Sequence, residues 1–360
     1  MKTSLYSKHI ELRAKMVDFA GYKMPIQYPQ GINLESKSVR QSVGLFDVSH
    51  MGQIYIKGEN SLDFVNYITT NNVSKLSPGQ CQYTLLCNDR GGIIDDLILY
   101  CLDDGYMLVV NAANIENDFN WIKQHKPKNI TIEDLSKNIS LIALQGPKSR
   151  YILSKFPELR ECLTDLKFYK FSNIKNKGMF DVISRTGYTG ELGFEIYSDH
   201  EFINYMWDKL ISDYSVSAVG LAARDILRLE MCYLLYGNDM NENITPYNCG
   251  LHWVVDLDKP NFIGRSELIN EKNSTDKKIV SFLVKDKCIP RKGYSLFCGD
   301  KEVGYVTSGT FSPNLASGIG MGYIQNKFIK KDNFHLRIRD RKFSINVFKG
   351  PFIKENSLFE

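Results

Sequence analysis

Hydrophobic and polar positions alternate through one long stretch of the chain and predict three consecutive antiparallel strands, at about 82–88, 93–102 and 106–111. Two short turns separate these strands, DRGG at 89–92 and DDG at 103–105. Both turns have the composition that hairpins require, because glycine tolerates positive φ and aspartate bonds its own backbone. We therefore take this three-strand unit as the centre around which the fold is organised.

The middle strand of this unit carries two adjacent carboxylates, Asp95 and Asp96, among aliphatic residues. Side chains alternate along a strand, so Asp96 shares a face with Tyr100 while Asp95 points the opposite way. A carboxylate in apolar surroundings is unfavourable unless it is paired, hydrogen-bonded or used. Either one Asp lies at a solvated edge and backbone amides satisfy the other, or one faces a ligand cavity as an acid, base or cation stabiliser.

Apolar residues at helical spacing predict helices over 33–43, 61–69 and 112–124 and from about Ala222. Arg224 lies near the start of the last helix, where the helix dipole disfavours a cation. Its position indicates either a specific anionic partner or an ordinary ion-paired arginine. From Lys277, short alternating runs separated by turns predict an all-β unit, a small barrel or roll, after the polar linker at 271–276.

The composition is that of a globular protein with a large core: 360 residues, 43% hydrophobic and 24% charged, with a net charge of +4. We expect neither a nucleic-acid-binding nor a membrane surface, because no long block of like charge and no apolar run of about 20 residues occurs. The eight cysteines are scattered without a CxxC pair, which argues against zinc and favours reduced thiols. The N-terminus does not resemble a secretion signal, so we expect a cytoplasmic protein.

Three short motifs are too weak to define a site. Asp47, Ser49 and His50 are close in sequence, but members of a hydrolase triad converge from distant segments, so we interpret them as a structural corner that lines a site. The segment GPKS at 146–149 lacks the upstream glycine and spacer of a phosphate loop. The segment GIGMGY near residue 318 opens no helix and does not qualify as a dinucleotide fingerprint.

Taken together, segments along nearly the whole chain resemble the T-protein of the glycine cleavage system, the tetrahydrofolate-dependent aminomethyltransferase family. The segments that carry the resemblance follow in unbroken order, and they include VGLFDVSHMGQ, GGIIDDLILY, VVNAANIENDFNWI, SRTGYTGELGFE, GLAARDILRLE, LHWVVDLDKPNFIGR and VTSGTFSPNLASGIGMGY. The resemblance implies an α+β fold, a three-unit cloverleaf around a central folate site. Two α/β antiparallel-sheet subdomains would occupy 1–275, one discontinuous and the other inserted at about 52–135, and a β-barrel would occupy 276–360.

The resemblance also implies a reaction. The carbon of an aminomethyl group, held as a thioether on the lipoyl arm of the carrier H-protein, would pass to tetrahydrofolate. The products would be 5,10-methylenetetrahydrofolate, ammonia and the dihydrolipoyl carrier, in glycine catabolism, with a functional link to the P- and L-proteins. Tetrahydrofolate would be a co-substrate, and no metal is implied.

The family's site residues transfer to positions that match its motifs. Asp96, the second Asp of GGIIDD, would be catalytic and Asp95 structural. Glu195 in GFE and Arg224 in AAR would bind the ligand. The remaining positions implied for the folate site are Tyr83, Tyr100, Asn111 and, in a less similar segment, Tyr169. The family's C-terminal contact does not transfer, because this chain ends in IKENSLFE.

Two kinds of relative remain as alternatives. Folate-linked demethylases of small methylated compounds share the fold, but GGIIDDLI with VVNAANIE is the aminomethyltransferase pattern. Folate-binding proteins that assist tRNA modification or iron-sulfur assembly carry a KGCYxGQE motif where this chain has NFIGRSEL. A non-catalytic folate-binding protein would be favoured by loss of the carboxylate at position 96, which is present.

Overall fold

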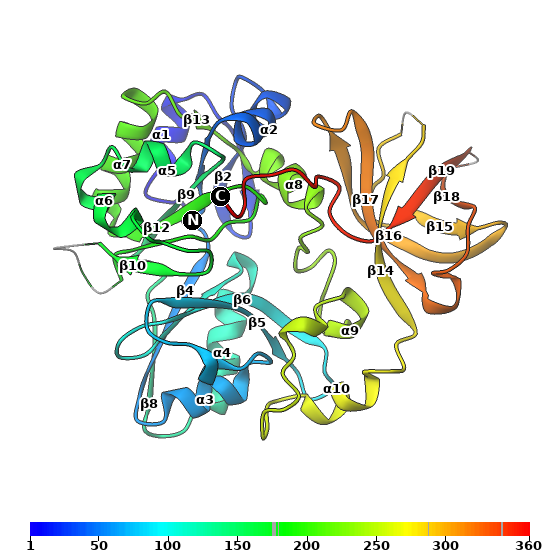
Figure 1. Cartoon of the computed structure of the whole chain (residues 1–360), viewed down its shortest axis with the longest axis horizontal. Coiled ribbons are helices and arrows are strands. Elements are labelled where there is room, and N and C mark those ends of the chain that lie inside the picture. The colour runs from blue at the N-terminus through cyan, green and yellow to red at the C-terminus, as the bar shows by residue number, and fades with distance from the viewer. Residues whose placement is uncertain (175–177, 179, 287, 340) are drawn as a thin grey trace.

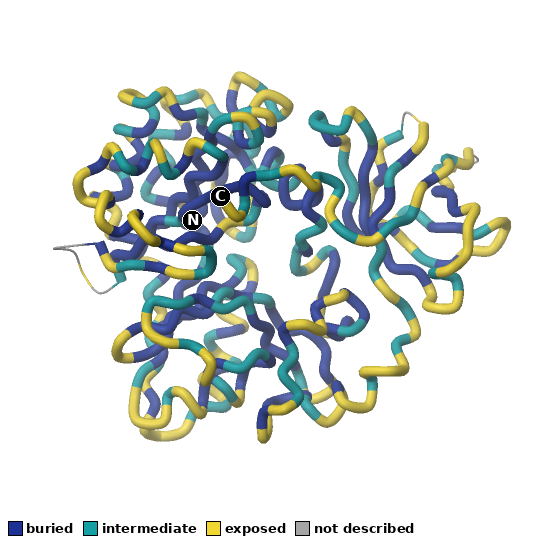
Figure 2. Tube along the Cα trace, viewed as in Figure 1, coloured by how far each residue is buried: buried dark blue, intermediate teal, exposed yellow. Residues whose placement is uncertain are grey.

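A computed structural model describes all residues of the chain except 175–177, 179, 287 and 340. Three units lie around a common junction (Figure 1). Many of the buried residues lie in the strands of all three units, and the outer loops are largely exposed (Figure 2). This arrangement confirms the α+β cloverleaf with a C-terminal barrel that the sequence predicts.

The first unit is built on a six-stranded sheet, in the order β10 (Phe171–Asn173), β11 (Val182–Ser184), β12 (Gly193–Ser198), β9 (Ser140–Gln145), β3 (Gly44–Asp47) and β13 (Ser217–Ala218). A hairpin of β1 (Lys15–Phe19) and β2 (Tyr22–Gln27) lies beside it. The helices of this unit are α1 (Tyr6–Glu11), α2 (Ile32–Gln41), α5 (Ser149–Leu153), α6 (Pro157–Leu163), α7 (His200–Ser212) and α8 (Leu221–Glu230).

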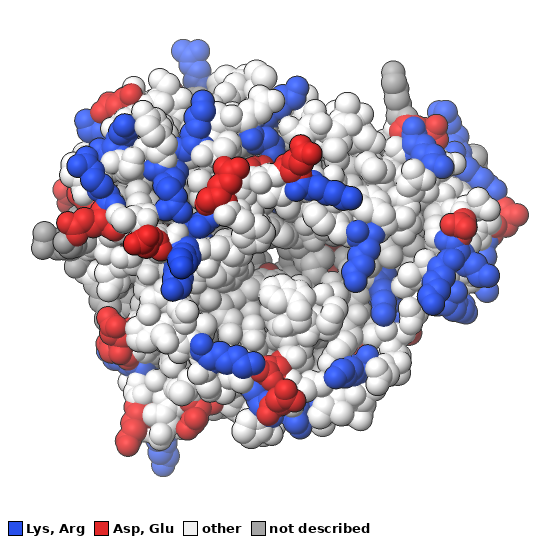
Figure 3. Space-filling model, in the orientation of Figure 1, with Lys and Arg blue, Asp and Glu red and all other residues white. Residues whose placement is uncertain are grey.

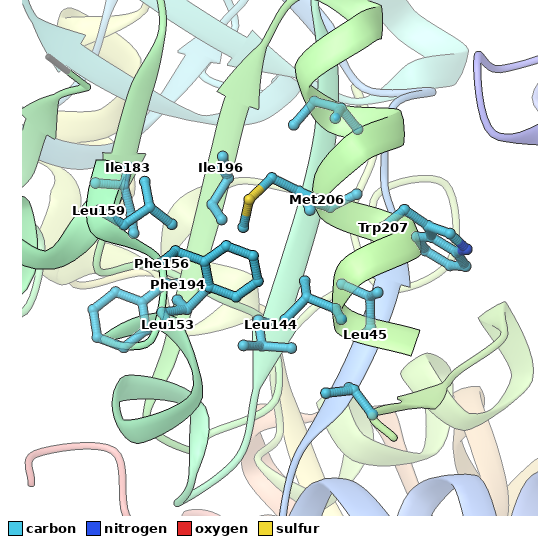
Figure 4. Close-up of a cluster of buried hydrophobic side chains, with 14 of the residues drawn as sticks. Leu45, Leu144, Leu153, Phe156, Leu159, Ile183, Phe194, Ile196, Met206 and Trp207 are labelled. Atoms are coloured by element: carbon cyan, nitrogen blue, oxygen red, sulfur yellow. The ribbon is translucent and has the colours of Figure 1, made fainter. Parts of the chain in front are cut away.

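Helix α7 shows how periodicity and capping build this unit. The Asp199 carboxylate accepts a hydrogen bond from the backbone N–H of Phe202 and so caps the first turn. Met206 and Trp207 lie on the face of the helix that turns toward the sheet, where Phe194 and Leu144 meet them (Figure 4). Burying this apolar face gives the helix its stability, because isolated helices of this length are marginal in water.

The second unit interrupts the first sheet. Strands β3 and β9 pair directly, yet the chain between them forms a separate five-stranded sheet. Its strands are, in order, β5 (Gln80–Cys87), β6 (Ile93–Cys101), β7 (Tyr106–Val110), β4 (Gly52–Gly58) and β8 (Ile130–Asp134), and its helices are α3 (Ser61–Ile68) and α4 (Ile115–His125). The three predicted strands are thus confirmed as β5, β6 and β7, with bounds that shift by one or two residues.

The turn between β5 and β6 needs glycine for space as well as for conformation. A Cβ atom on Gly92 would lie 1.9 Å from the carbonyl oxygen of Glu242, and Gly91 has a φ of +78°. The loop that contains Glu242 therefore passes directly over this turn, and it brings the segment after α8 against the second unit. Short helices α9 (Pro246–Cys249) and α10 (Arg265–Glu271) continue that segment.

The third unit is a closed barrel of six strands, in the order β14 (Lys277–Val284), β17 (Ser317–Gln325), β16 (Lys301–Ser312), β15 (Ser295–Cys298), β18 (Phe334–Ile338) and β19 (Arg341–Phe348). The predicted all-β terminal unit is therefore a barrel. Closure pairs every strand on both sides and leaves no open edge. Among the described residues, no helix combines the length and the apolar character that crossing a bilayer requires.

Buried ion pairs and hydrogen bonds on α8 connect the first unit to the barrel and to the segment that follows α8. Glu230 accepts hydrogen bonds from Arg40 on α2 at 2.8 and 3.0 Å and from Asn314 in the barrel at 2.8 Å. Arg228 donates to Asp239 and to Ser308 on β16, both at 2.8 Å. The side chain of Glu230 is 0% exposed and that of Arg40 is 8% exposed, so these charges depend on their partners.

The C-terminal segment returns from the barrel to the first unit. The Ser357 hydroxyl donates to Glu191 at 2.6 Å, and the same carboxylate accepts a hydrogen bond from Arg40 at 2.8 Å. The guanidinium of Arg185 donates to the carbonyl oxygen of Leu358 at 3.1 Å. The chain therefore ends on the first unit, a contact that the sequence did not predict.

We expect Arg40→Met to lower the free energy of unfolding by about 3–5 kcal/mol, because it leaves the buried carboxylates of Glu230 and Glu191 without a cation. Urea denaturation measures this change. Lys209→Ala is the control, since Lys209 pairs with Asp213 on an exposed helix surface and its loss is expected to change the free energy by less than about 1 kcal/mol. Equal effects of the two substitutions would contradict the connecting role of Arg40.

Candidate active site

The two adjacent aspartates of β6 face different parts of the molecule. Leu97 and Leu99, on the Asp95 face, pack in the core with residues of α3 and α4. Leu85, which pairs with Asp96 across β5 and β6, packs with Leu229 of α8 and with barrel residues. Asp95 therefore points toward the helices of the second unit and Asp96 toward the junction of the three units.

Two neighbours hold the carboxylate of Asp96. The hydroxyl of Tyr83 donates to Oδ2 at 2.9 Å, and Nδ2 of Asn111 donates to Oδ1 at 2.9 Å. Tyr83 reaches Asp96 because it lies on the same face of the adjacent strand β5, one diagonal position away. Asn111 follows β7, the other neighbour of β6, so strands on both sides of Asp96 orient it.

The pKa of the Asp96 carboxyl group lies near neutral pH. Burial raises the pKa of this carboxyl, and the adjacent charge of Asp95 raises it further. Hydrogen bonds from Tyr83 and Asn111 favour the ionised form and oppose the rise, which leaves a pKa of about 7. A carboxyl group with this pKa serves well as an acid or a base under physiological conditions.

Asp95 is fully buried and surrounded by amide donors. Its oxygens accept hydrogen bonds from Nδ2 of Asn111 at 2.8 Å, from the backbone N–H of Asn111 at 3.1 Å and from Nδ2 of Asn114 at 2.7 Å. Nδ2 of Asn111 also donates a hydrogen bond to Asp96, so Asn111 links the two carboxylates. The structural role expected for Asp95 remains a prediction that this geometry supports.

A second carboxylate, the half-buried Glu195 of β12, faces the site from the first unit. The hydroxyl of Thr186 donates to Glu195. Burial raises the pKa of Glu195, while this hydrogen bond and the positive charge of Arg224 on α8 lower it. The guanidinium of Arg224 lies 4.5 Å from the centre of the Tyr188 ring, a cation–π contact. The anionic partner that the position of Arg224 indicated is thus present in the chain itself.

Tyr100 lies behind Glu195. Its side chain is fully buried, and its hydroxyl bonds that of Ser184 at 3.0 Å and that of Tyr197 at 2.9 Å. Ser184 in turn bonds the Thr186 hydroxyl at 2.7 Å. The structure therefore connects Tyr100 to Glu195 through two hydroxyl groups, and we infer that Tyr100 orients Glu195 from behind.

Tyr169 lies between the two carboxylates. Burial raises the pKa of its phenol, and the charges of Glu195 and Asp96 contribute to this rise. Its backbone carbonyl accepts a hydrogen bond from the N–H of Cys81 on β5 at 2.8 Å. Its backbone N–H donates to the carbonyl oxygen of Arg185 at 3.1 Å. Tyr169 thus joins the second unit to the first beside the candidate site.

The sequence analysis missed two side chains near this site, Trp253 and Asp118, and it had placed a third, His50, in a corner that lines a site. Trp253 stacks on Tyr83 with ring centres 5.9 Å apart, and it is 64% exposed. His50 is buried with Nδ1 unpaired, and burial together with the charge of Arg224 lowers its pKa to about 4, so it is neutral. Asp118 is buried on α4, and its two carboxylate oxygens have no hydrogen-bond partner among the described residues. The helical pattern assigned α4 only to the core, although Asp118 lies four residues after Asn114 on the same face.

The corner formed by Asp47, Ser49 and His50 is not a hydrolase triad. Asp47 accepts hydrogen bonds from His9 at 2.9 Å and from Thr3 at 2.7 Å, and the Ser49 hydroxyl bonds the backbone of Leu141. Among the residues that the structure describes, no group of three or more His, Cys, Asp or Glu side chains is arranged to hold a metal ion.

The site therefore offers two kinds of chemistry. Asp96 can exchange a proton and stabilise a positive charge at the junction of the units. Glu195, held with Arg224 on the first unit, can accept two hydrogen bonds at once from adjacent N–H groups of a ligand. Both carboxylates come from rigid strands, which limits their movement relative to each other.

We expect Tyr83→Phe to raise the pKa of Asp96 by about one unit, because a hydrogen bond that stabilises the ionised form is lost. Carbon-13 NMR of aspartate-labelled protein measures this titration. The control is Tyr151→Phe, since Tyr151 is exposed and remote from β6. A titration that stays unchanged in Tyr83→Phe would show that the phenol does not tune Asp96.

Comparison with known proteins gives a consistent result over the whole chain. The family model of the GCVT N-terminal domain matches residues 5–259, and that of the glycine cleavage T-protein C-terminal barrel domain matches residues 277–354. An aminomethyltransferase of Halothermothrix orenii is 45% identical over 358 residues, which cover 98% of this chain and 99% of that protein. One of Pseudothermotoga lettingae is 45% identical over 359 residues, with 98% of each covered.

A solved structure agrees with these matches. The crystal structure of glycine cleavage system aminomethyltransferase T from Bartonella henselae matches with a TM-score of 0.92 and 32% sequence identity, and 99% of each chain is covered. The resemblance found in the sequence is thereby confirmed. The chain belongs to the glycine cleavage T-protein family of aminomethyltransferases.

Proposed function

We propose that this protein transfers the methylene carbon of an aminomethyl group from the dihydrolipoyl arm of H-protein to tetrahydrofolate. The products are 5,10-methylenetetrahydrofolate, ammonia and dihydrolipoyl H-protein, and the reaction serves glycine catabolism together with the P- and L-proteins. The observation that carries this proposal is Asp96, poised near neutral pH by Tyr83, Asn111 and Asp95 at the junction of the three units.

Asp96 is the catalytic group in this proposal. When the carbon–sulfur bond of the donor breaks, positive charge develops on the aminomethyl carbon. An ionised carboxylate beside that carbon stabilises the charge, and it can also accept a proton as the acceptor nitrogen of tetrahydrofolate forms its new bond. Asp96 is only partly exposed, and both effects are stronger at such a position than in bulk water.

The residues around Glu195 suit the pterin of a folate. A pterin presents adjacent N–H donors, and a carboxylate can accept two of them. Arg224 balances the charge of Glu195 and can attract the acidic groups of the ligand. Tyr83, Asn111 and Tyr169 line the region between Glu195 and Asp96 in this proposal, and Tyr100 acts through Ser184 and Thr186 instead of touching the ligand.

The carrier must present its lipoyl arm to Asp96 from outside. Figure 3 shows the molecule hollowed where the three units meet, with Lys and Arg side chains and some Asp and Glu side chains around the hollow. Positive side chains at this place favour the approach of an acidic carrier protein. The exposed Trp253 lies beside Tyr83 and offers an apolar surface for a hydrocarbon arm.

Single-turnover kinetics test this function. Aminomethyl-lipoyl H-protein is mixed with the enzyme, with and without tetrahydrofolate, and ammonia and methylenetetrahydrofolate are measured. We expect tetrahydrofolate to accelerate ammonia release strongly and the methylene product to form. If H-protein is inert while tetrahydrofolate still binds, the proposal is wrong and a small-molecule demethylase becomes the leading alternative.

We expect Asp96→Asn to lower the single-turnover rate by about 10² or more while tetrahydrofolate binding persists, because an acid–base and electrostatic group is lost and its shape is kept. Rapid-quench kinetics and equilibrium fluorescence binding measure the two quantities. The matched control is Asp89→Asn in the exposed turn before β6, which we expect to react at the normal rate. Normal turnover of Asp96→Asn would refute the assignment.

The rate should depend on pH through Asp96. A carboxyl whose pKa is raised to about 7 is ionised above that pH and protonated below it. We therefore expect the single-turnover rate to be constant above about pH 7.5 and to fall about tenfold for each pH unit below 6.5, measured with saturating carrier. A rate that stays constant down to about pH 5 would show that Asp96 ionises normally.

A further inference from the structure

Lys259 is a buried lysine that the proposed mechanism does not use. It lies in the loop between Trp253 and α10, and it is only 2% exposed. Its Nζ donates hydrogen bonds to three backbone carbonyl oxygens, those of Asn66 at 2.7 Å, Thr69 at 2.6 Å and Asn71 at 2.9 Å. Only the charged ammonium form has three N–H bonds to donate, so these contacts require the cation.

The three carbonyl groups belong to the end of α3 and to the turn that follows it. The last carbonyl groups of a helix have no partner within the helix, and the helix dipole places partial negative charge there. Burial lowers the pKa of the Lys259 amine, whereas the charge of Asp256 and the hydrogen bonds to three carbonyl oxygens favour its charged form. These oxygens account for all three ammonium hydrogens, so Lys259 has no free N–H with which to act on a ligand.

The turn after α3 is bound to β5, the strand that carries Tyr83. The backbone N–H of Thr70 donates to the carbonyl oxygen of Leu85 at 3.0 Å. Nδ2 of Asn71 donates to the carbonyl oxygen of Tyr83, also at 3.0 Å. The turn therefore holds the backbone of Tyr83, the residue whose phenol donates to Asp96.

The same turn is bound to the segment that carries Trp253. The Thr70 hydroxyl donates to the carbonyl oxygen of Val254 at 2.8 Å, and the backbone N–H of Asp256 donates to the carbonyl oxygen of Thr70 at 3.0 Å. Trp253, the residue before Val254, stacks on Tyr83 with ring centres 5.9 Å apart and ring planes inclined by 24°. One turn thus connects both members of the stacked pair.

We propose that Lys259 is a positioning residue of the candidate active site: its ammonium group shapes the turn after α3, and this turn keeps the rings of Tyr83 and Trp253 stacked. The functional part of the proposal rests on the catalytic role proposed above for Asp96, which the Tyr83 phenol contacts at 2.9 Å. Without the ammonium group, three backbone carbonyl groups lose a donor and the turn relaxes. The two rings then no longer share one defined orientation, and the phenol moves relative to Asp96.

Fluorine NMR of the intact protein, labelled with 5-fluorotryptophan, tests the position of Trp253 without any assay of transfer. The chain has three tryptophans, and the resonance of Trp253 is the one that is lost in Trp253→Phe. In Lys259→Met we expect this resonance to move in the direction in which it moves in Tyr83→Leu, where the stacking ring is absent. The resonances of Trp121 on α4 and Trp207 in the core of the first unit should stay in place.

Thr70→Val breaks the same connection more mildly, because it removes the hydroxyl that donates to Val254 and leaves Lys259 in place. We expect the Trp253 resonance to move in the same direction as in Lys259→Met. The matched control is Lys272→Met, since Lys272 is exposed at the end of α10. In this control the resonance should keep its wild-type position.

Asp96 should respond to the same substitution. In Lys259→Met we expect the carbon-13 titration of Asp96 to move in the direction expected for Tyr83→Phe, because the phenol no longer donates in its defined geometry. We also expect the single-turnover rate with saturating carrier and tetrahydrofolate to fall about tenfold or more, since a small displacement within a site has an effect of this size. Lys272→Met should match the wild-type protein in both measurements.

A purely structural role of Lys259 predicts a different result. The melting temperature of Lys259→Met would fall, while the Trp253 resonance and the Asp96 titration of the folded variant coincided with those of the wild-type protein, and this result would overturn the proposal. Movement of all three tryptophan resonances would also overturn it, because the effect would not be local. If Lys259→Met does not fold, an unmoved Trp253 resonance in Thr70→Val overturns the proposal.

The two proposals fail in different measurements. If the wild-type protein does not transfer the aminomethyl carbon, the proposed function is wrong. The fluorine resonance of Trp253 in the same variants still decides whether Lys259 positions the stacked pair.

Discussion

The buried ion pairs of α8 are the interaction on which the remaining structure depends. From one helix, Arg228 reaches Asp239 and the barrel, and Glu230 reaches both Arg40 and the barrel. Charges that are buried this deeply require their partners at defined distances, since an unpaired charge in the interior is strongly unfavourable. The helix therefore sets how the barrel lies against the first sheet, and the same helix positions Arg224 beside Glu195.

A site at the junction of three units has a chemical advantage. The two carboxylates come from separate sheets, so their environments differ. Asp96 has an anionic neighbour and two hydrogen-bond donors, which place its pKa near 7. For Glu195, burial raises the pKa, and the hydrogen bond from Thr186 and the charge of Arg224 oppose that rise. One fold thus provides two carboxyl groups in different surroundings, each suited to its proposed task.

Hydrogen bonds from buried side chains next to the site also orient Glu195. Tyr100 reaches Glu195 through Ser184 and Thr186. A fully buried phenol thus orients a carboxylate that faces the junction. Because the interior is poorly polarisable, a proton or charge placed there acts strongly on its neighbours.

The sequence by itself determined the local helices and strands and the opposite orientations of the Asp95 and Asp96 side chains. Alternation predicted β5, β6 and β7 and placed Asp95 and Asp96 on opposite faces, because side-chain direction along a strand depends only on residue order. Motifs identified the family. The tertiary structure alone decided which groups Tyr100 contacts and where the C-terminal segment docks, on Glu191. These contacts join residues far apart in sequence or in different elements, and local periodicity carries no information about which faces will meet when the units pack together.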